Sequence, residues 1–206
     1  MAERGLLTRA RRRCRFSGRL SVVFGLSIAI APGADGKPVR DEPWVREQIA
    51  WANRLFEPAE VAFRWTADRV VPATAARMET RADRDALGED ALFEPRVVDV
   101  TIVDTLRDVD DPSRLRMGVC WQSRRDPARR YLIVASTARP TVLAHELGHF
   151  FGNPHTQVPN NLMSYLRPDP DAVAFDPLQL GTVRAHAKTA LATGLLVAQL
   201  PARLHP

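Results

Sequence analysis

Cysteine, lysine and long apolar runs are all scarce in this sequence. Its 206 residues include two cysteines, Cys14 and Cys120, so we expect free thiols rather than a disulfide framework, and the count does not identify the redox compartment. The main apolar run, residues 20–31, is too short to cross a bilayer as a helix. No internal repeat or low-complexity linker divides the chain. These absences favour one globular domain with no transmembrane segment.

Positive charge is concentrated at one end of the chain. Lysine occurs as Lys37 and Lys188, so almost all of the basic charge is arginine. Residues 1–19 contain seven arginines and one glutamate, a net charge of +6, whereas the whole chain carries +5. We predict that residues 1–19 form a disordered basic arm and that residues 20–206 form the domain. Any polyanion binding would belong to the arm, so no specific nucleic-acid partner is expected.

The run LSVVFGLSIAIA, residues 20–31, permits more than one interpretation. Large apolar residues alternate with mostly small ones, which is typical of a β-strand with one packed face. The preceding arginines and the final Ala29-Ile30-Ala31 also match a cleaved secretory signal, and an uncleaved anchor is a third interpretation. Pro32 disfavours cleavage, and a signal has no need of strict alternation. We therefore predict a first strand, which implies a cytoplasmic protein if no export signal exists.

The remaining chain shows both strand and helix patterns. Apolar residues recur every three or four positions from Trp44 to Phe56, which predicts an amphipathic helix that packs on a sheet. A crossover helix between two strands favours parallel pairing. Residues 66–95 are predicted to be a loop with at most one surface helix. Calcium binding is conceivable at the acidic residues 104–112, but they lack EF-hand spacing, so we predict a solvated turn. Further strands are predicted at residues 61–65, 96–103, 117–122 and 131–136, and further helices at residues 140–152 and 176–196.

The segment HELGHFFGNPH contains three of the five histidines in the chain. In a helix, His145 and His149 leave the same face and can reach one ion. Glu146 lies about 100° further around the axis, where it can contact a ligand of that ion without coordinating it. Gly152 permits a chain reversal at the helix C-terminus. That reversal can bring His155 round as a third nitrogen ligand.

Three imidazoles and one open position are typical of a catalytic zinc site, whereas a structural site takes all four ligands from protein. Zinc would bring the pKa of a bound water to roughly 7. Glu146 could then accept a proton as this water attacks a carbonyl, and later pass it to the leaving amine. HExxH alone occurs by chance on ordinary helices. Gly152 and His155 bring the specified positions to five in eleven residues, which favours the metal site.

The pattern HExxHxxGxxH followed by a methionine turn resembles the metzincin clan of zinc endopeptidases. Residues 161–165, NLMSY, match that turn, and the resemblance implies that Met163 forms an apolar floor beneath the metal. Tyr165 occupies a position where astacin-like and serralysin-like members carry a tyrosine near the zinc. By resemblance it would coordinate the metal at rest and stabilise the oxyanion, or else pack beside the site. Asn153-Pro154 and the scarcity of cysteine are closer to compact bacterial-type or pappalysin-like members.

The resemblance also implies an α+β, zincin-like fold. We expect a twisted, mostly parallel sheet with one antiparallel edge strand, a crossover helix, an active-site helix, and a small C-terminal subdomain with a final helix. The catalytic domain would divide into an upper subdomain, residues 20–155, and a lower one, residues 156–206. His186 then lies in the final helix, where we expect a surface or packing role, and His205 in the tail. By resemblance the protein would be secreted or extracytoplasmic.

These residues together predict a zinc-dependent endopeptidase with Zn²⁺ as cofactor and a peptide or protein as substrate. The residue after the cut would face residues 156–163 and 166–175. The alternative is a non-catalytic, zinc-stabilised module that binds a protein or peptide, which would have no need of the general base Glu146. The sequence does not indicate the oligomeric state. An extended substrate would pair with the edge strand, in contact with Gly118, Val119, Cys120 and Trp121.

Overall fold

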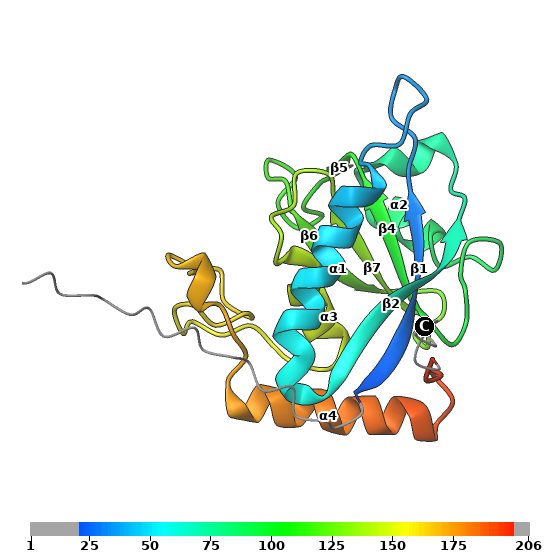
Figure 1. Cartoon of the computed structure of the whole chain (residues 1–206). Coiled ribbons are helices and arrows are strands. Elements are labelled where there is room, and N and C mark those ends of the chain that lie inside the picture. The colour runs from blue at the N-terminus through cyan, green and yellow to red at the C-terminus, as the bar shows by residue number, and fades with distance from the viewer. Residues whose placement is uncertain (1–20, 200–206) are drawn as a thin grey trace, which may run out of the picture.

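The computed structural model describes residues 21–199, so the predicted arm at residues 1–19, Cys14 and His205 lie outside the described residues. A five-stranded sheet with strand order β2-β1-β4-β7-β6 forms the centre of the molecule (Figure 1). All neighbouring pairs are parallel except β6 and β7. The predicted parallel sheet with one antiparallel edge is therefore confirmed. The strands are β1 (Val22–Ile30), β2 (Val61–Arg69), β4 (Val98–Val103), β6 (Gly118–Gln122) and β7 (Arg130–Ala135).

Four helices surround this sheet (Figure 1). α1 (Glu42–Phe56) and α3 (Val142–Phe150) cover one face, and the short α2 (Arg81–Ala86) lies on the other. α4 (Pro177–Ala192) crosses beneath the start of β1 and β2. This mixed arrangement is the predicted fold class. Within residues 21–199, the helices are all too short or too polar to cross a membrane.

β1 confirms the strand predicted at the start of the domain. Its large residues Phe24, Leu26 and Ile28 join the main apolar core beneath α1 and α3. The expectation of one packed face is wrong, because Ser27 and Ala29 on the other face are also fully buried. The small residues in the alternation therefore mark a second covered face, not a solvent-facing one.

Aromatic rings connect the two helices that cover the first face. Asp41 caps α1 by accepting a hydrogen bond from the Trp44 N–H at 3.1 Å. At the other end of α1, Phe56 packs on Phe151, which directly follows α3. Edge and tilted contacts of this kind each add about 0.5–1.5 kcal/mol beyond the burial of area. The cluster has centroid distances between 5.0 and 6.0 Å and comprises Phe24, Phe56, Phe63, Phe151 and Phe175.

The segment between β2 and β4 differs from the loop that was predicted. β2 extends four residues beyond the predicted end, to Arg69, and the chain then forms η2 (Ala73–Ala76), β3 (Arg77–Met78) and α2. α2 is the one surface helix that was allowed for, but its inner side buries charged residues, because Arg84 and Asp85 are only 2% and 3% exposed. This segment covers the second face of the sheet. Its apolar residues, including Val71, Met78 and Leu87, join a second buried cluster, but charged residues are buried among them and interrupt the apolar pattern.

Those charged residues are held by specific partners. The Asp85 carboxylate accepts hydrogen bonds from Trp121 Nε1 and Arg124 Nε, each at 2.8 Å. Nearby, Arg69 Nε lies 3.2 Å from Asp99 Oδ1, and both side chains are almost completely buried. Removing one partner from a buried ion pair of this kind strongly destabilises the folded protein.

The acidic segment at residues 104–112 is also more structured than a solvated turn. Within it, β5 (Thr105–Leu106) pairs in parallel with β3 as a separate two-stranded sheet. Asp108 is 5% exposed, and its Oδ1 accepts backbone hydrogen bonds from Asp110 and Asp111 at 2.9 and 3.3 Å. The prediction of a wholly solvated turn is therefore wrong at Asp108.

α4 begins with a capping box and ends four residues before the predicted boundary. Asp176 accepts from the Gln179 N–H at 2.9 Å, and Gln179 Oε1 accepts from the Asp176 N–H at 3.0 Å. The same Gln179 oxygen accepts from Asn161 Nδ2 at 2.9 Å, and its backbone carbonyl accepts from Asn153 Nδ2 at 3.4 Å. The first turn of α4 thus contacts two loop residues near the histidine motif. Two further short turns are η1 (Glu57–Ala59) and η3 (Pro170–Ala172).

Candidate metal centre

The turn after α3 brings the third histidine back toward the helix. α3 places His145 and His149 one turn apart on the same side. Gly152 follows with a φ of 88°, a left-handed conformation that costs glycine little. The ring of His186 from α4 packs directly against Gly152, so a side chain there would have no room. This reversal returns His155 to the face of α3, and His186 has the packing role that was expected.

Three imidazole nitrogens converge on one point. The Nε2 atom of His149 lies 3.2 Å from that of His145 and 3.0 Å from that of His155, and the third separation is 3.3 Å. Ligands at about 2.0–2.1 Å from a tetrahedral zinc are roughly 3.3–3.4 Å apart. The nitrogen triangle is therefore close in size to one face of a zinc coordination tetrahedron. Within residues 21–199, the group consists of these three side chains.

The other nitrogen of each helix histidine faces a backbone carbonyl. His145 Nδ1 lies 2.7 Å from the Leu162 oxygen, and His149 Nδ1 lies 2.8 Å from the Asn153 oxygen. Because a carbonyl can only accept, Nδ1 carries the proton in each ring and Nε2 presents a lone pair. Two such lone pairs 3.2 Å apart repel each other unless a cation lies between them. The donor set therefore fits a divalent metal, and imidazole ligands suit zinc.

Arg167 competes for one of these nitrogens. Its Nη2 lies 2.8 Å from His145 Nδ1, and a guanidinium can only donate. The nitrogen cannot donate to Leu162 and accept from Arg167 at once. The carbonyl contact is the shorter and matches the arrangement at the second helix histidine, so we assign the proton to Nδ1. Arg167 retains hydrogen bonds to the Thr141 hydroxyl at 2.9 Å and the Ser164 carbonyl at 2.6 Å.

Burial keeps the three histidines neutral. It lowers the pKa of His145 to about 3 and that of His149 to about 4, and neighbouring positive groups lower both further against the carbonyl hydrogen bonds. Burial also lowers the pKa of the more exposed His155. Neutral imidazole is the form that binds metals. Protons therefore compete weakly with a metal for these nitrogens near neutral pH.

Glu146 lies beside the triangle and is 5% exposed. Burial raises the pKa of its carboxyl to about 8, against the opposing effects of a hydrogen bond from the Cys120 N–H and the charges of Arg116 and Arg167. A cation held by the histidines would favour the carboxylate form. Gly118 of β6 leaves room for this carboxyl, because a Cβ there would lie 2.6 Å from Glu146 Oε1. A larger residue at position 118 would displace the glutamate.

The turn that follows the third histidine brings two more predicted residues to the centre. Met163 is fully buried, and its sulfur packs directly against Gly148 of α3. The Met163 N–H donates to Asn161 Oδ1 at 2.8 Å. Tyr165 is 67% exposed, and its ring centroid lies 4.7 Å from that of His155. Met163 thus supports α3 from inside the protein, and Tyr165 borders the open side of the triangle of histidine nitrogens.

Sequence reasoning missed a charged pair that reaches this centre. Arg116 Nη2 lies 2.7 Å from Oδ2 of the buried Asp108, and Arg116 lines the same cleft as Tyr165 and the three histidines. Asp108 was predicted to be solvated because the acidic segment contains no metal-binding spacing. The buried pair carries no local pattern, and its two members come from a turn and from the residues before β6.

β6 borders a cleft of about 320 Å³ that contains the metal centre. Of the predicted substrate-binding residues, Gly118, Val119 and Cys120 line this cleft. The indole of Trp121 turns to the opposite face, where it donates to Asp85. Burial raises the pKa of the Cys120 thiol to about 12, so the thiol stays protonated. In the sheet of residues 21–199, β6 has one strand neighbour, which leaves its outer edge open.

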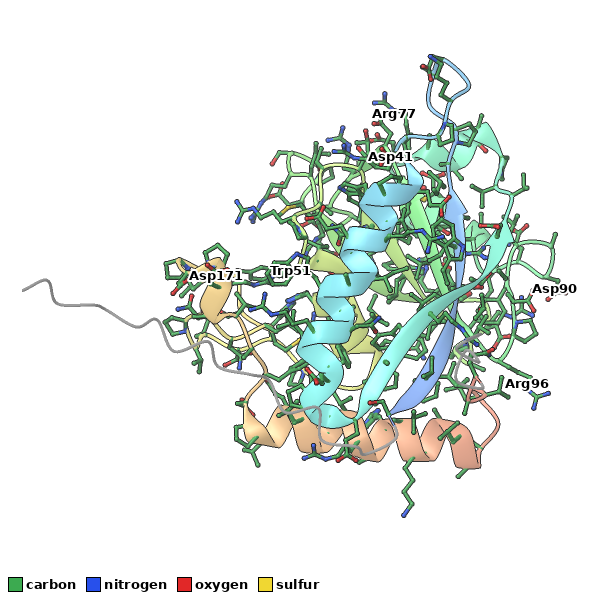
Figure 2. All side chains as sticks on the ribbon, in the orientation of Figure 1. Asp41, Trp51, Arg77, Asp90, Arg96 and Asp171 are labelled. Atoms are coloured by element: carbon green, nitrogen blue, oxygen red, sulfur yellow. The ribbon has the colours of Figure 1, made fainter. Side chains whose placement is uncertain are left out.

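A second cleft, of about 470 Å³, adjoins the first at His145 and Glu146. Trp51 extends from α1 toward the turn that carries Asp171, along one wall of this cleft (Figure 2). The loop at residues 166–175 supplies another wall, and residues 156–163 are not among the described lining. The segment before β6 and the start of α3 line the rest of this cleft.

No protein-family model and no curated protein sequence matches the chain. Solved structures do match it. Metalloproteinase-II from Bacteroides fragilis superposes with a TM-score of 0.56 at 13% identity, over 81% of this chain and 53% of that one. Mirolysin in complex with compound 9 superposes with a TM-score of 0.57 at 8% identity, over 87% of this chain and 100% of that one.

The first of these structures is a metalloproteinase by its name, and this chain shares the fold of both. The chain spans about half the length of the Bacteroides fragilis protein. At these identities the similarity concerns the fold. The chemistry of this chain must be argued from its own residues, and the group of three histidines is the part of the structure that points to a metal.

Proposed function

We propose that the chain is a zinc-dependent endopeptidase of the metzincin type. The observation that carries the proposal is the convergence of three Nε2 atoms, 3.0–3.3 Å apart, beside a buried glutamate. His145, His149 and His155 would hold the ion. Zinc bound there would act as a Lewis acid and bring the pKa of a bound water to roughly 7. The fold shared with a metalloproteinase supports the same assignment.

Glu146 is the general base of the proposed reaction. It accepts the proton of the attacking water and transfers it to the leaving amine. The hydrogen bond from the Cys120 N–H orients its carboxyl, and Gly118 leaves that carboxyl space. The Tyr165 phenol stabilises the oxyanion of the transition state, and Arg116 positions that phenol. Both assignments go beyond the observed contacts and are part of the proposal.

The substrate is an extended peptide that pairs with the open edge of β6. The backbone of Gly118 to Trp121 supplies the hydrogen bonds, as in other cases of strand addition. The residue after the cut then enters the second cleft, toward the loop at residues 166–175. Met163 has a structural role in this proposal, because it packs against α3 and reaches no solvent.

Purified full-length protein tests the proposal most directly. We expect it to cleave an unstructured protein such as casein, to lose this activity with a chelator, and to regain it when Zn²⁺ is added back. His155→Gln should reduce zinc stoichiometry and activity together, whereas Lys188→Gln at an exposed position of α4 should retain both. Cleavage that survives complete zinc removal would contradict the mechanism. Stoichiometric zinc without cleavage of any substrate would favour the non-catalytic binding module.

A further inference from the structure

The second cleft carries more positive than negative charge. Glu146 and Asp108 are the acids in its described lining. Asp108 is already paired with Arg116, and Glu146 accepts the Cys120 N–H. The described lining therefore holds four guanidinium groups against two carboxylates, one of which is already paired. The arginines that line it are Arg114, Arg116, Arg139 and Arg167.

Arg139 and Arg167 face this cleft without an ion-pair partner. In the part of the chain between residues 21 and 199, no carboxylate forms an ion pair with either guanidinium. Burial lowers the pKa of Arg167, and the nearby charge of Arg139 lowers it further against the opposing effect of Glu146. Two like charges at one cavity favour an anion between them.

The rest of the lining suits a side chain with an apolar stem. Trp51, Val142 and Val173 form apolar walls, and such surroundings strengthen a hydrogen bond to a charged group. Asp171, on the turn that projects beyond Trp51 (Figure 2), is exposed and lies outside the described lining. It therefore does not compete for the arginines within the cleft.

We infer that the second cleft selects an acidic side chain, glutamate or aspartate, for the residue after the cut. The inference rests on the proposed function, since it needs the scissile bond to lie at Glu146. The carboxylate accepts hydrogen bonds from Arg139 and Arg167, a geometry to which guanidinium groups are suited. Trp51 and Val142 pack against the aliphatic part of the side chain.

Matched peptides test this inference. The cleavage site is first mapped with a proteome-derived peptide library and mass spectrometry. Quenched fluorescent peptides that differ solely in the residue after the cut then compare Glu, Gln, Leu and Lys. We expect kcat/KM for Glu to exceed that for Gln by at least about tenfold, because hydrogen bonds to an ionised acceptor are roughly twice as strong as neutral ones.

Variants assign the preference to the arginines. Arg139→Gln is the cleaner change, because its exposed side chain does not touch the metal centre, and Arg167→Gln should act in the same direction. Each should reduce the Glu-to-Gln ratio several-fold, and Arg139→Glu should raise kcat/KM for Lys. Arg184→Gln on α4 makes the same charge change away from the cleft and should leave the ratio unchanged. The ratio within one enzyme is independent of any general loss of activity.

Failure of this inference can be distinguished from failure of the proposed function. Zinc-dependent cleavage with no acidic preference, or with an equal ratio in all variants, overturns the inference and leaves the endopeptidase intact. If no peptide is cleaved, the proposed function fails, and fluorescence anisotropy of the labelled Glu and Gln peptides decides the preference of the cleft. Equal Kd values for the two peptides would then overturn it.

Discussion

The two faces of the central sheet are covered in different ways. On the first face, α1 and α3 bury a continuous apolar core, and α3 also carries the candidate metal ligands. On the second face, a smaller apolar cluster is accompanied by buried charged groups such as Arg84 and Asp99. We therefore expect the first face to combine stability with chemistry and the second face to contribute mainly to stability. Substitutions on each face can test this division.

The largest expected effect is on chemistry at the first face. Glu146→Gln keeps the shape of a buried side chain but removes the base, so kcat should fall by about 10²–10⁴-fold. Zinc stoichiometry and the thermal unfolding curve should stay near those of the unchanged protein. Peptide hydrolysis, elemental analysis and circular dichroism measure the three quantities. Full activity in this variant would remove the distinction between the faces.

On the second face, Arg69→Met should destabilise the protein by about 3–5 kcal/mol, because it leaves Asp99 buried without its partner. Urea unfolding measures the change. Arg77→Met is a matched control, because Arg77 pairs with Glu79 at the surface over 3.7 Å, and such pairs contribute about 0–1 kcal/mol. Activity per folded molecule should stay unchanged in both variants. Equal losses of stability would show that the buried pair has no special role.

The loss of stability in Arg69→Met should also depend on pH, and the pKa of Asp99 determines the direction. Burial raises the pKa of Asp99 to about 6, and Arg69 opposes that rise. Without Arg69 the folded-state pKa lies still higher above the unfolded value of about 3.9. A raised folded-state pKa favours the folded form below the unfolded value, and this advantage is lost as pH rises through the folded value. Both proteins lose this advantage alike up to about pH 6, where Asp99 ionises in the unchanged protein, so the deficit of Arg69→Met should grow as the pH rises above about 6. A constant deficit would contradict the assignment.

Gly118→Ala should affect both stability and chemistry at the first face. The new Cβ would lie 2.6 Å from Glu146 Oε1 and 2.7 Å from Val142 Cγ1. We expect a loss of about 1–3 kcal/mol from overpacking and a reduced kcat with zinc retained. Gly181→Ala in α4 is the matched control, since a Cβ there has no neighbour within 4 Å. Helix propensity predicts that the control gains about 0.5–1 kcal/mol. Retained kcat in Gly118→Ala would show that Glu146 tolerates displacement.

The smallest expected effect comes from one neutral hydrogen bond at the second face. The Tyr131 hydroxyl donates to the Arg84 carbonyl at 2.6 Å in a buried setting. Tyr131→Phe removes the donor and should cost about 0.5–1.5 kcal/mol. Peptide hydrolysis should be unaffected. A change in kcat larger than threefold would show that the second face also controls the chemistry.

Elements with apolar periodicity could be predicted from the sequence. The alternation in β1, the amphipathic pattern of α1 and the capping residues of α4 each contain their own local signal, and each element lies where it was expected. α2 has no such signal, because its buried residues Arg84 and Asp85 are charged. Their partners lie in distant segments, so the sequence shows no local reason for burial.

The candidate site likewise contains residues that the sequence could identify and residues that it could not. His145, Glu146, His149 and His155 could be identified because helix periodicity and one glycine relate them within eleven residues. The pair of Asp108 and Arg116 could not, because burial and tertiary packing create it. The roles of Tyr165 and of the β6 backbone remain predictions. Their positions beside the triangle and along its cleft agree with those roles.

The capping residue Gln179 couples a distant helix to the metal centre. It bonds Asn161, which holds the backbone of Met163, and Asn153, whose carbonyl faces His149. We therefore expect the affinity for an ion at the histidines to be linked to the order of the first turn of α4. Adding the ion should slow hydrogen exchange at the backbone amides of this first turn. Fraying of the turn should conversely lower the affinity of the histidines for the ion.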